Sequence, residues 1–351
     1  MDTSLRKEFG QAYARLAGLG LVVEGYATER AELEVSSGFL RVTTTVVLRG
    51  GGHEGRGEDV TYAAEDHAPY PLKLPLAGSW TLDGFSRLVG GLDLFPGRPP
   101  QQEFFRPYRR WAFESAALDL ALRQQGQSLG AALGLPYRPL RFVVSTRLDI
   151  EPWLAVDPAL EFKLDPTPEW DTESMKRIAA TGRVRVLDFK AFYEGSPVDN
   201  PPDPVQYEAV ATAFPEAILE DPQLAGPARA VLDGQEVRFS YDAPIHSWAD
   251  VQALPSRPHY LNVKPSRFGS LSALLDCVER AQAAGMVLYG GGQFELDVGR
   301  EHIQALASLF YAGGLNDVAP RDFHGAAHAG VPRSPLVPLA QAPGFGFAFR
   351  A

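Results

Sequence analysis

Cysteine is almost absent from this sequence, since Cys277 is the only one among 351 residues. A single cysteine excludes an intramolecular disulfide framework and any zinc site built from several cysteines. Long apolar runs are missing as well. No stretch reaches about 18 apolar residues, and the N-terminal stretch lacks the apolar centre of a signal peptide. We therefore expect a protein of the cytoplasm that does not contact a membrane.

The sequence has fewer basic than acidic residues. Lysine and arginine total 33 against 43 aspartate and glutamate residues, which gives a formal net charge of −10. A nucleic-acid groove needs clustered lysine and arginine, and no such cluster occurs, so we expect no nucleic-acid partner. What the chain does have is length and 45% hydrophobic residues, enough for a barrel domain and a smaller second domain.

The first part of the chain predicts antiparallel strands. Residues 33–50 are rich in β-branched side chains and carry a turn signal at Ser37 and Gly38, which predicts a hairpin. The glycine-rich residues 50–59 are interpreted as a loop. They lack the order of strand, glycine fingerprint and helix that a phosphate site requires, so we assign them no phosphate role.

A buried helix is predicted within residues 105–135. Apolar residues recur at i, i+3, i+4 and i+7 from Trp111 through Leu122, and Gly126 provides a stop signal. Cys277 has similar spacing among apolar neighbours in residues 271–282, which predicts a position in the core rather than a reactive one.

After Pro139 the pattern changes to short apolar runs that alternate with amphipathic segments such as residues 171–182 and 270–285. Repeated strand and helix units predict a parallel sheet, and seven or eight of them predict a β/α barrel. The apolar runs are residues 141–148, 159–164, 183–189, 216–220, 237–242, 259–264 and 286–291.

Five of these runs carry a charged residue at or near their end. In a β/α barrel the loops after the strands form the mouth, so residues at the C-terminal strand ends converge on one site. In chain order these residues are Lys163, Asp188, Glu220, Asp242 and Lys264. Three successive carboxylates thus stand between two lysines, an order that is hard to assign to chance.

Three carboxylates at one barrel mouth would raise each other's pKa unless a cation neutralises them. Oxygen ligands with open positions suit Mg²⁺, with Mn²⁺ as a substitute. Such an ion can bind a substrate carboxylate and stabilise the charge left when the neighbouring carbon loses a proton. The sequence therefore predicts a metal site formed by Asp188, Glu220 and Asp242.

The two lysines then have a predicted role in proton transfer. A lysine near a metal and a second cation loses its proton more readily than in water. We expect Lys163 and Lys264 to face each other across the barrel. One would abstract the α-proton, and the other would stabilise the enediolate or act as the acid on the opposite face. Structural ion pairs or surface positions are the alternative for both lysines.

The motifs that carry these five residues, taken in chain order, resemble those of the enolase superfamily. The branch they resemble is the muconate cycloisomerase-like one, which includes o-succinylbenzoate synthases and N-succinylamino acid racemases. LEFKLD, LDFK, LEDP, SYDAP and NVKPSRFG resemble the functional strand ends. YGGGQFELDVGR is similar to the segment that closes one side of the pocket, and GGLNDVAP resembles the eighth strand. The resemblance covers nearly the whole chain. It implies an α/β fold in three parts: an α+β capping domain over residues 1–138, a modified TIM-type (β/α)7β barrel over 139–322, and a C-terminal return to the capping domain over 323–351.

The resemblance also assigns roles to residues. It implies catalytic Lys163 and Lys264 and the three metal ligands named above. For Tyr26 and Arg41, a position on the hairpin surface is the alternative. The residues that would line a substrate pocket are Tyr26, Arg41, Lys190, Asn262, Gly291, Gly292, Gln293 and Glu295.

Several positions depart from the family pattern. Lys190 stands where the family usually has asparagine, and either shifts the charge balance of the site or pairs with a nearby carboxylate. Ala243 replaces a residue that is usually acidic, and Glu161 replaces the first lysine of the Lys-x-Lys motif. Asn316 and Asp317 do not give the paired aspartates of dipeptide epimerases, which argues against that activity.

The resemblance implies Mg²⁺-dependent abstraction of a proton α to a carboxylate in a small-molecule substrate. Dehydration of the o-succinylbenzoate synthase kind is favoured. Racemisation of an N-acylamino acid, or cycloisomerisation, would use the same residues. A protein that keeps the fold but only binds its ligand is the alternative of another class. Barrels of this type commonly self-associate, so a homo-oligomer is among the assemblies that the sequence allows.

Overall fold

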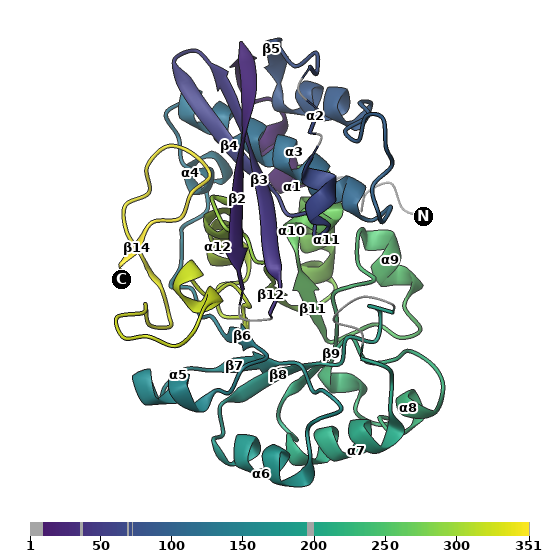
Figure 1. Ribbon diagram of the computed structural model, residues 1–351. Helices are drawn as coiled ribbons and strands as arrows, with labels where there is room; N and C mark the ends of the chain where they lie inside the picture. The colour runs from purple at the N-terminus through teal and green to yellow at the C-terminus, as the bar shows by residue number, and fades with distance from the viewer. Residues whose placement is uncertain (1–9, 36–37, 69, 72, 195–199, 351) are drawn as a thin grey trace.

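The computed structural model describes residues 10–35, 38–68, 70–71, 73–194 and 200–350. Figure 1 shows two parts, an N-terminal domain above a strongly curled sheet, with the C-terminal segment running along one side of both. No helix within the described residues is long and apolar enough to cross a membrane. The N-terminal elements are α1 Gln11–Ala17, β1 Gly20–Val23, β2 Gly25–Glu34, β3 Leu40–Gly50, β4 His53–Asp59, β5 Gly78–Thr81, α2 Leu82–Gly90, α3 Phe105–Gln124 and α4 Leu129–Leu133.

The predicted hairpin is confirmed. Strands β2 and β3 pair antiparallel from Gly25 opposite Arg49 to Glu34 opposite Leu40. Ser37 of the predicted turn lies outside the described residues. In Figure 1 these two long strands run from the top of the domain down to the curled sheet, so the end of β2 and the start of β3 lie at the junction of the two parts.

The glycine-rich segment differs from its prediction, because most of it is not a loop. Residues 53–59 form strand β4, which pairs antiparallel with β3. Its glycines allow close packing, because a Cβ on Gly57 would overlap the main chain of Ala112 and Ala116 in α3. The segment therefore lacks side-chain bulk because a helix lies directly against it, a tertiary reason that the local sequence does not reveal.

Helix α3 confirms the predicted buried helix. Every residue from Trp111 through Leu122 is buried, including Glu114 and Asp119. A helix that is covered on all sides belongs to the centre of its domain. It ends at Gln124, two residues before the predicted stop at Gly126.

The alternation of strands and helices after residue 139 is confirmed as a seven-stranded parallel sheet with the spatial order β12-β11-β10-β9-β8-β7-β6. Neighbours in sequence are neighbours in space, as the strand and helix repeat requires. The strands are β6 Val144–Thr146, β7 Phe162–Leu164, β8 Val184–Asp188, β9 Ile218–Glu220, β10 Phe239–Tyr241, β11 Tyr260–Val263 and β12 Val287–Gly290. The helices are α5 Glu151–Val156, α6 Thr172–Ala180, α7 Pro204–Ala213, α8 Pro227–Ala230, α9 Trp248–Ala253, α10 Pro265–Phe268, α11 Leu271–Ala283 and α12 Gly299–Phe310.

The two edges of the curled sheet meet at Asn316 and Asp317. Asn316 forms a parallel bridge with Phe142, next to β6, and Asp317 forms one with Gly291, next to β12. These are isolated bridges and not an eighth strand. The (β/α)7β form therefore stays a prediction, whereas the mixed α/β fold with a curled parallel sheet and an antiparallel N-terminal sheet is present.

The C-terminal segment contacts both parts of the molecule. It contains the paired strands β13 Val337–Pro338 and β14 Phe349–Arg350. The ring of Phe345 lies 6.4 Å from that of Trp111 in α3 and stacks on His302 of α12 at 4.2 Å. The predicted domain limits at residues 138 and 322 are not tested by these contacts.

Candidate active site

The sheet places the predicted charged residues at one edge. Asp188 and Glu220 are the last residues of β8 and β9, and Asp242 follows the last residue of β10. Lys163 is the central residue of β7, and Lys264 follows β11 directly. Because parallel strands share one C-terminal edge, these five side chains come from the same end of the sheet.

Lys163 joins two of the carboxylates. Its ammonium pairs with Glu220 and lies 3.1 Å from Asp188, while the side chain is only 1% exposed. Glu220 also accepts hydrogen bonds from the side-chain amide of Asn262, at 3.1 Å, and from the hydroxyl of Tyr289. The ammonium of Lys163 is further held by Asp317 at 3.5 Å. An ammonium this deeply buried requires such partners.

The third carboxylate has its own cations. Lys264 lies 2.6 Å from one oxygen of Asp242, and Arg267 lies 3.0 Å from the other. Lys163 and Lys264 thus stand beside different members of the carboxylate cluster. That they face each other across the barrel stays a prediction.

Burial and neighbouring charges set the protonation of the cluster. Burial disfavours the ammonium of Lys163, but the charges of Glu220 and Asp188 outweigh burial and raise its pKa well above the usual value. Burial, together with Asp188, raises the pKa of Glu220 to about 8. For Asp242 burial is outweighed by Arg267 and Lys264, which lower its pKa to about 2. The carboxylates therefore favour the charged form of both lysines. The easier proton loss expected from the sequence applies to a lysine beside a metal ion and stays a prediction.

The carboxylate cluster fits a hard divalent ion. One oxygen of each of Asp188, Glu220 and Asp242 lies within 4.8 Å of the other two. Both oxygens of Asp242 are buried, and each has one ion-pair partner, Lys264 or Arg267, which leaves a second lone pair on each oxygen for another ligand. Three carboxylate oxygens are a donor set that Mg²⁺ prefers. The residues present can therefore hold a divalent metal ion, Mg²⁺ above all.

Of the five predicted pocket residues in β11 and after β12, two contact this cluster or its lysine, and three have partners outside it. Asn262 contacts Glu220, and a Cβ on Gly291 would come within 2.7 Å of Lys264. Gln293 donates to the hydroxyl of Ser266 at 2.6 Å. Gly292 and Glu295 both lie at the guanidinium of Arg300. A Cβ on Gly292 would meet the Arg300 guanidinium, and Glu295 pairs with that arginine at 2.9 Å.

Tyr26 and Arg41 are placed differently. Tyr26 lies near the start of β2, where its hydroxyl donates to the Pro71 carbonyl. No contact among the described residues links it to the cluster, and this end of the hairpin lies away from the curled sheet. Arg41 is fully buried and donates to the carbonyl oxygens of Val60 and Thr61. Arg41 also donates to the Phe294 carbonyl at 3.4 Å, so it links the N-terminal domain to the segment that carries Gln293 and Glu295. Tyr26 is tied within the N-terminal domain. A substrate contact for either residue stays a prediction.

Lys190 pairs with carboxylates, which answers the question that the sequence left open. Its ammonium contacts Asp188 and lies 3.7 Å from Asp165. Burial opposes its charge, but Asp165 and Asp188 raise its pKa well above the usual value. The cluster therefore has a further cation beside Asp188, at the position where the motif that the sequence resembles has asparagine.

Four residues near the cluster were missed by the sequence analysis. Asp221 follows Glu220 and accepts the main-chain N–H groups of Asp242 and Ala243, at 2.8 and 3.0 Å. Burial and Asp242 raise the pKa of Asp221 to about 7. The other three residues, described above, are Arg267, Tyr289 and Asp317. Asp221 follows Glu220, and Arg267 is three residues after Lys264, so their closeness in sequence to predicted site residues could have identified them.

Backbone strain also marks this edge of the sheet. Among the described residues, the non-glycine residues with positive φ are Lys190, Asp221 and Phe294, at 57°, 46° and 50°. All three lie in segments that follow strands of the curled sheet. Strained backbone of this kind tends to occur at functional sites, where surrounding contacts hold it.

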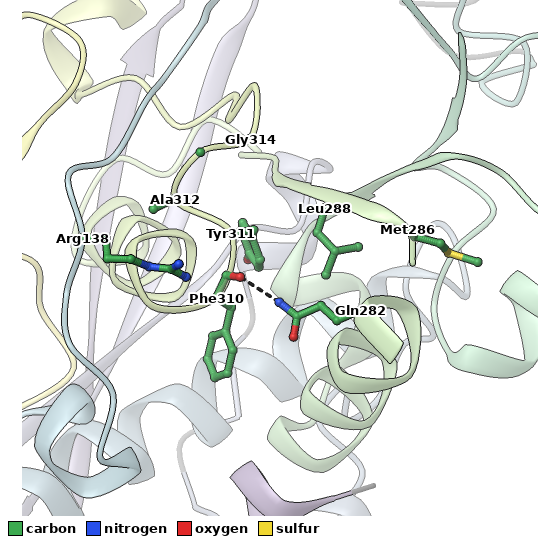
Figure 2. A pocket seen from close by; sticks show the side chains of 9 residues that line it. Arg138, Gln282, Met286, Leu288, Phe310, Tyr311, Ala312 and Gly314 are labelled. Carbon is green, nitrogen blue, oxygen red and sulfur yellow. Dashed lines mark hydrogen bonds between the residues drawn. The ribbon is translucent and has the colours of Figure 1, made fainter. Parts of the chain in front are cut away.

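A cavity of about 170 Å³ lies elsewhere (Figure 2). Met286, the residue before β12, lines it, whereas the carboxylates stand at the C-terminal ends of their strands, so the cavity lies at the opposite edge of the sheet. One wall is tied by a hydrogen bond of 2.7 Å from Gln282 to the Phe310 carbonyl. The further lining residues are Arg138, Leu288, Tyr311, Ala312, Gly313 and Gly314. This cavity is no part of the candidate active site.

Comparison of the sequence with protein families gives two matches. Residues 14–132 match the N-terminal domain of the family described as a domain of unknown function, DUF8230, and residues 136–325 match its C-terminal domain. No curated protein matches the sequence.

Comparison with solved structures gives enolase-superfamily proteins. A dipeptide epimerase from Methylococcus capsulatus complexed with a Mg ion has 18% identity and a TM-score of 0.68, over 94% of this chain and 100% of that one. A muconate cycloisomerase from Pseudomonas fluorescens has 16% identity and a TM-score of 0.65, over 94% and 97%. An enolase-superfamily member from Listeria innocua has 20% identity and a TM-score of 0.65, over 94% and 95%. At this identity the likeness shows a shared fold.

Proposed function

The chain belongs to the DUF8230 family, and we propose that it is an enzyme that abstracts a proton from the carbon next to a substrate carboxylate, with a divalent metal ion. One observation carries the proposal: the Lys163 ammonium lies in contact with two members of a buried carboxylate cluster whose oxygens lie within 4.8 Å of one another. The enolase-superfamily fold of its structural neighbours supports the same chemistry by analogy.

Each group has a separate task in this proposal. Asp188, Glu220 and Asp242 hold the metal ion, which we take to be Mg²⁺. When bound, Mg²⁺ supplies positive charge that holds the substrate carboxylate, stabilises the charge left by the proton, and offsets the carboxylates that keep Lys163 protonated. Lys163 receives the α-proton on Nζ, and Lys264 acts from the side of Asp242 as the second acid or base.

The neighbouring residues position these groups. Asn262 and Tyr289 donate to Glu220, so the orientation of this carboxylate is fixed. Gly291 leaves room for the Lys264 side chain, since a Cβ there would come within 2.7 Å of it. Groups held in this way lose little entropy on reaching the reactive geometry.

For the fate of the substrate after proton loss, we propose β-elimination of water of the o-succinylbenzoate synthase kind. The support is the resemblance of the strand-end motifs, since the residues of the cluster provide only the shared first step. Racemisation of an N-acylamino acid or cycloisomerisation would need the same residues. Lys163 and Lys264 are placed beside different carboxylates, which is compatible with all three outcomes.

The test is hydrogen exchange in D₂O, followed by NMR, with Mg²⁺ and a panel of carboxylates. The panel contains the o-succinylbenzoate precursor, N-succinylamino acids, dipeptides and cis,cis-muconate. We expect uptake of deuterium at the α-carbon, or dehydration, with at least one compound. Lys163→Ala and Lys264→Ala should each slow the reaction by about 10²- to 10⁴-fold. The matched control is Lys176→Ala, which removes an exposed lysine from α6 and should leave the rate unchanged.

Two results would contradict the proposal. A rate that is unaffected in both lysine variants would show that these side chains do not transfer the proton. Absence of exchange with every compound, together with Mg²⁺ binding that is lost in Asp242→Asn, would favour a protein that binds its ligand without transforming it.

A further inference from the structure

We propose that Lys190 is a tethered counter-cation of the metal site, which neutralises Asp188 in the metal-free protein and releases it to the metal by moving to Asp165. This inference rests on the proposed metal site and says which residue controls how tightly that site binds the metal ion. The residue is also a point at which this chain departs from the enolase-superfamily pattern.

The first observation is how completely Lys190 engages Asp188. Its main-chain N–H donates to one carboxylate oxygen at 3.1 Å, and its ammonium donates to the other. The residue holds a left-handed backbone conformation, with φ of 57°, which a lysine rarely adopts. The surrounding structure must maintain this conformation. It allows Lys190 to contact both oxygens of Asp188, a predicted metal ligand.

The second observation is that the ammonium has another carboxylate within reach. Asp165 lies 3.7 Å from the Lys190 ammonium, and Arg147 holds this aspartate in place at 2.8 Å. Asp165 follows β7 and is not part of the cluster that fits a metal ion. A lysine ammonium on its flexible stem can rotate between two such acceptors without losing ion pairing. The ring of Tyr193, 5.1 Å away, provides a third favourable contact.

The third observation distinguishes Lys190 from the other cations at the cluster. Its side chain is 13% exposed, against 1% for Lys163 and 7% for Lys264 and Arg267. Lys163 also contacts two members of the cluster, whereas Lys190 contacts Asp188 alone. Lys190 can therefore leave the cluster while the remaining ion pairs persist.

An ammonium and a divalent ion at the same carboxylate repel each other. Binding of the metal must therefore displace the ammonium, and the free energy of that displacement is subtracted from the free energy of metal binding. If Lys190 is replaced by a neutral residue, metal binding no longer includes this cost. The substitution should tighten Mg²⁺ binding and, at the same time, destabilise the metal-free protein.

The experiment is calorimetric titration of MgCl₂ into EDTA-treated and dialysed full-length protein. Lys190→Asn suits the left-handed backbone, and Lys190→Met keeps the length of the side chain without its charge. We expect both variants to lower the Kd for Mg²⁺ by about tenfold or more. Lys176→Met, which removes an exposed lysine from α6, should leave the Kd unchanged.

A double-mutant cycle tests the route of displacement. Asp165→Asn removes the second acceptor, so it should weaken Mg²⁺ binding in the wild-type background. In a Lys190→Met background it should have no effect, because no ammonium remains to be moved. Thermal unfolding provides a second readout: relative to wild type, Lys190→Met should be less stable in EDTA and show a larger rise in Tm with Mg²⁺.

The outcomes distinguish failure of the Lys190 counter-cation role from failure of the metal site itself. If wild type binds Mg²⁺ and neither Lys190 variant binds it more tightly, the counter-cation role is wrong while the metal site stands. If Lys190→Asn binds Mg²⁺ more tightly and Lys190→Met does not, the tighter binding comes from the new amide oxygen. That result would also overturn the counter-cation role of Lys190. If no variant binds Mg²⁺, the metal site of the proposed function fails and the inference fails with it.

Discussion

Asp221 connects two strand ends of the candidate active site. Both of its oxygens are used, since one accepts the N–H of Asp242 and the other accepts the N–H of Ala243. The sequence places alanine at 243, where the enolase-superfamily motif that it resembles usually has an acidic residue. In space, an acidic side chain from the neighbouring strand end reaches the main chain at that position. Asp221 thereby fixes the direction in which the Asp242 carboxylate points.

Asp221→Asn should weaken this connection. An amide has a single acceptor oxygen, so one of the two buried N–H groups would face an NH₂ group and lose its hydrogen bond. We expect a loss of about 1–3 kcal/mol in the free energy of unfolding, together with weaker Mg²⁺ binding through displacement of Asp242. Denaturant unfolding and calorimetry measure the two effects. Asp233→Asn, on an exposed carboxylate, is the control, and equal behaviour of the two variants would refute the positioning role.

At the level of elements, the packing of α3 on β4 explains the glycine-rich segment. Gly55 and Gly57 leave no side chain between strand and helix, and a Cβ at either position would overlap the main chain of α3. The strand could not be recognised from its sequence, because β-propensity depends on packing partners and two of its seven residues are glycine. Its partner β3 was recognisable from its β-branched residues.

Gly57→Ala should therefore destabilise the N-terminal domain. The added methyl group has to push α3 away or bend β4, and overpacking of this kind costs about 1–3 kcal/mol. Urea unfolding followed by circular dichroism measures the change. Gly25→Ala, in β2 of the same sheet, is a matched control because a Cβ there meets no atom within 4 Å. A Gly57 variant as stable as the Gly25 variant would contradict the close packing.

At the scale of the whole molecule, Glu58 joins the two parts of the chain. This buried residue of β4 accepts the N–H groups of Leu296 at 2.6 Å and Gly299 at 2.8 Å, where α12 begins. Burial, with a further contribution from Glu295, raises the pKa of Glu58 from 4.5 to about 7. The junction between the N-terminal domain and the curled sheet therefore contains a group that titrates near neutral pH.

The sign of the resulting pH dependence follows from linkage. Between about pH 4.5 and 7 the folded protein holds a proton on Glu58 that the unfolded chain has released. Stability should fall as the pH rises through this window, by about 1.4 kcal/mol per pH unit for one such group, and should level off above it. Denaturant unfolding from pH 5 to 8 should show a smaller slope in Glu58→Gln. The exposed Glu54→Gln on the same strand should keep the wild-type slope, and an unchanged slope in Glu58→Gln would contradict the assignment.

Much of the site could be predicted from the sequence because parallel strands share an edge. The order of apolar runs placed Asp188 and Glu220 at strand ends, and alternation of strands and helices then required them to lie side by side. The hairpin and the buried helix were likewise visible in periodicity. These features depend on local patterns, and local patterns are what a single sequence contains.

The sequence by itself determined the order of strands and the identity of the clustered charges. Only the tertiary structure decided which charges pair, that Lys190 contacts Asp188, and that Arg41 links the N-terminal domain to Phe294 after β12. It also decided that the eighth position of the sheet consists of isolated bridges. The physical reason is that ion pairing and desolvation depend on distances of a few ångströms between segments far apart in the chain, and the sequence pattern fixes the segments but not those distances.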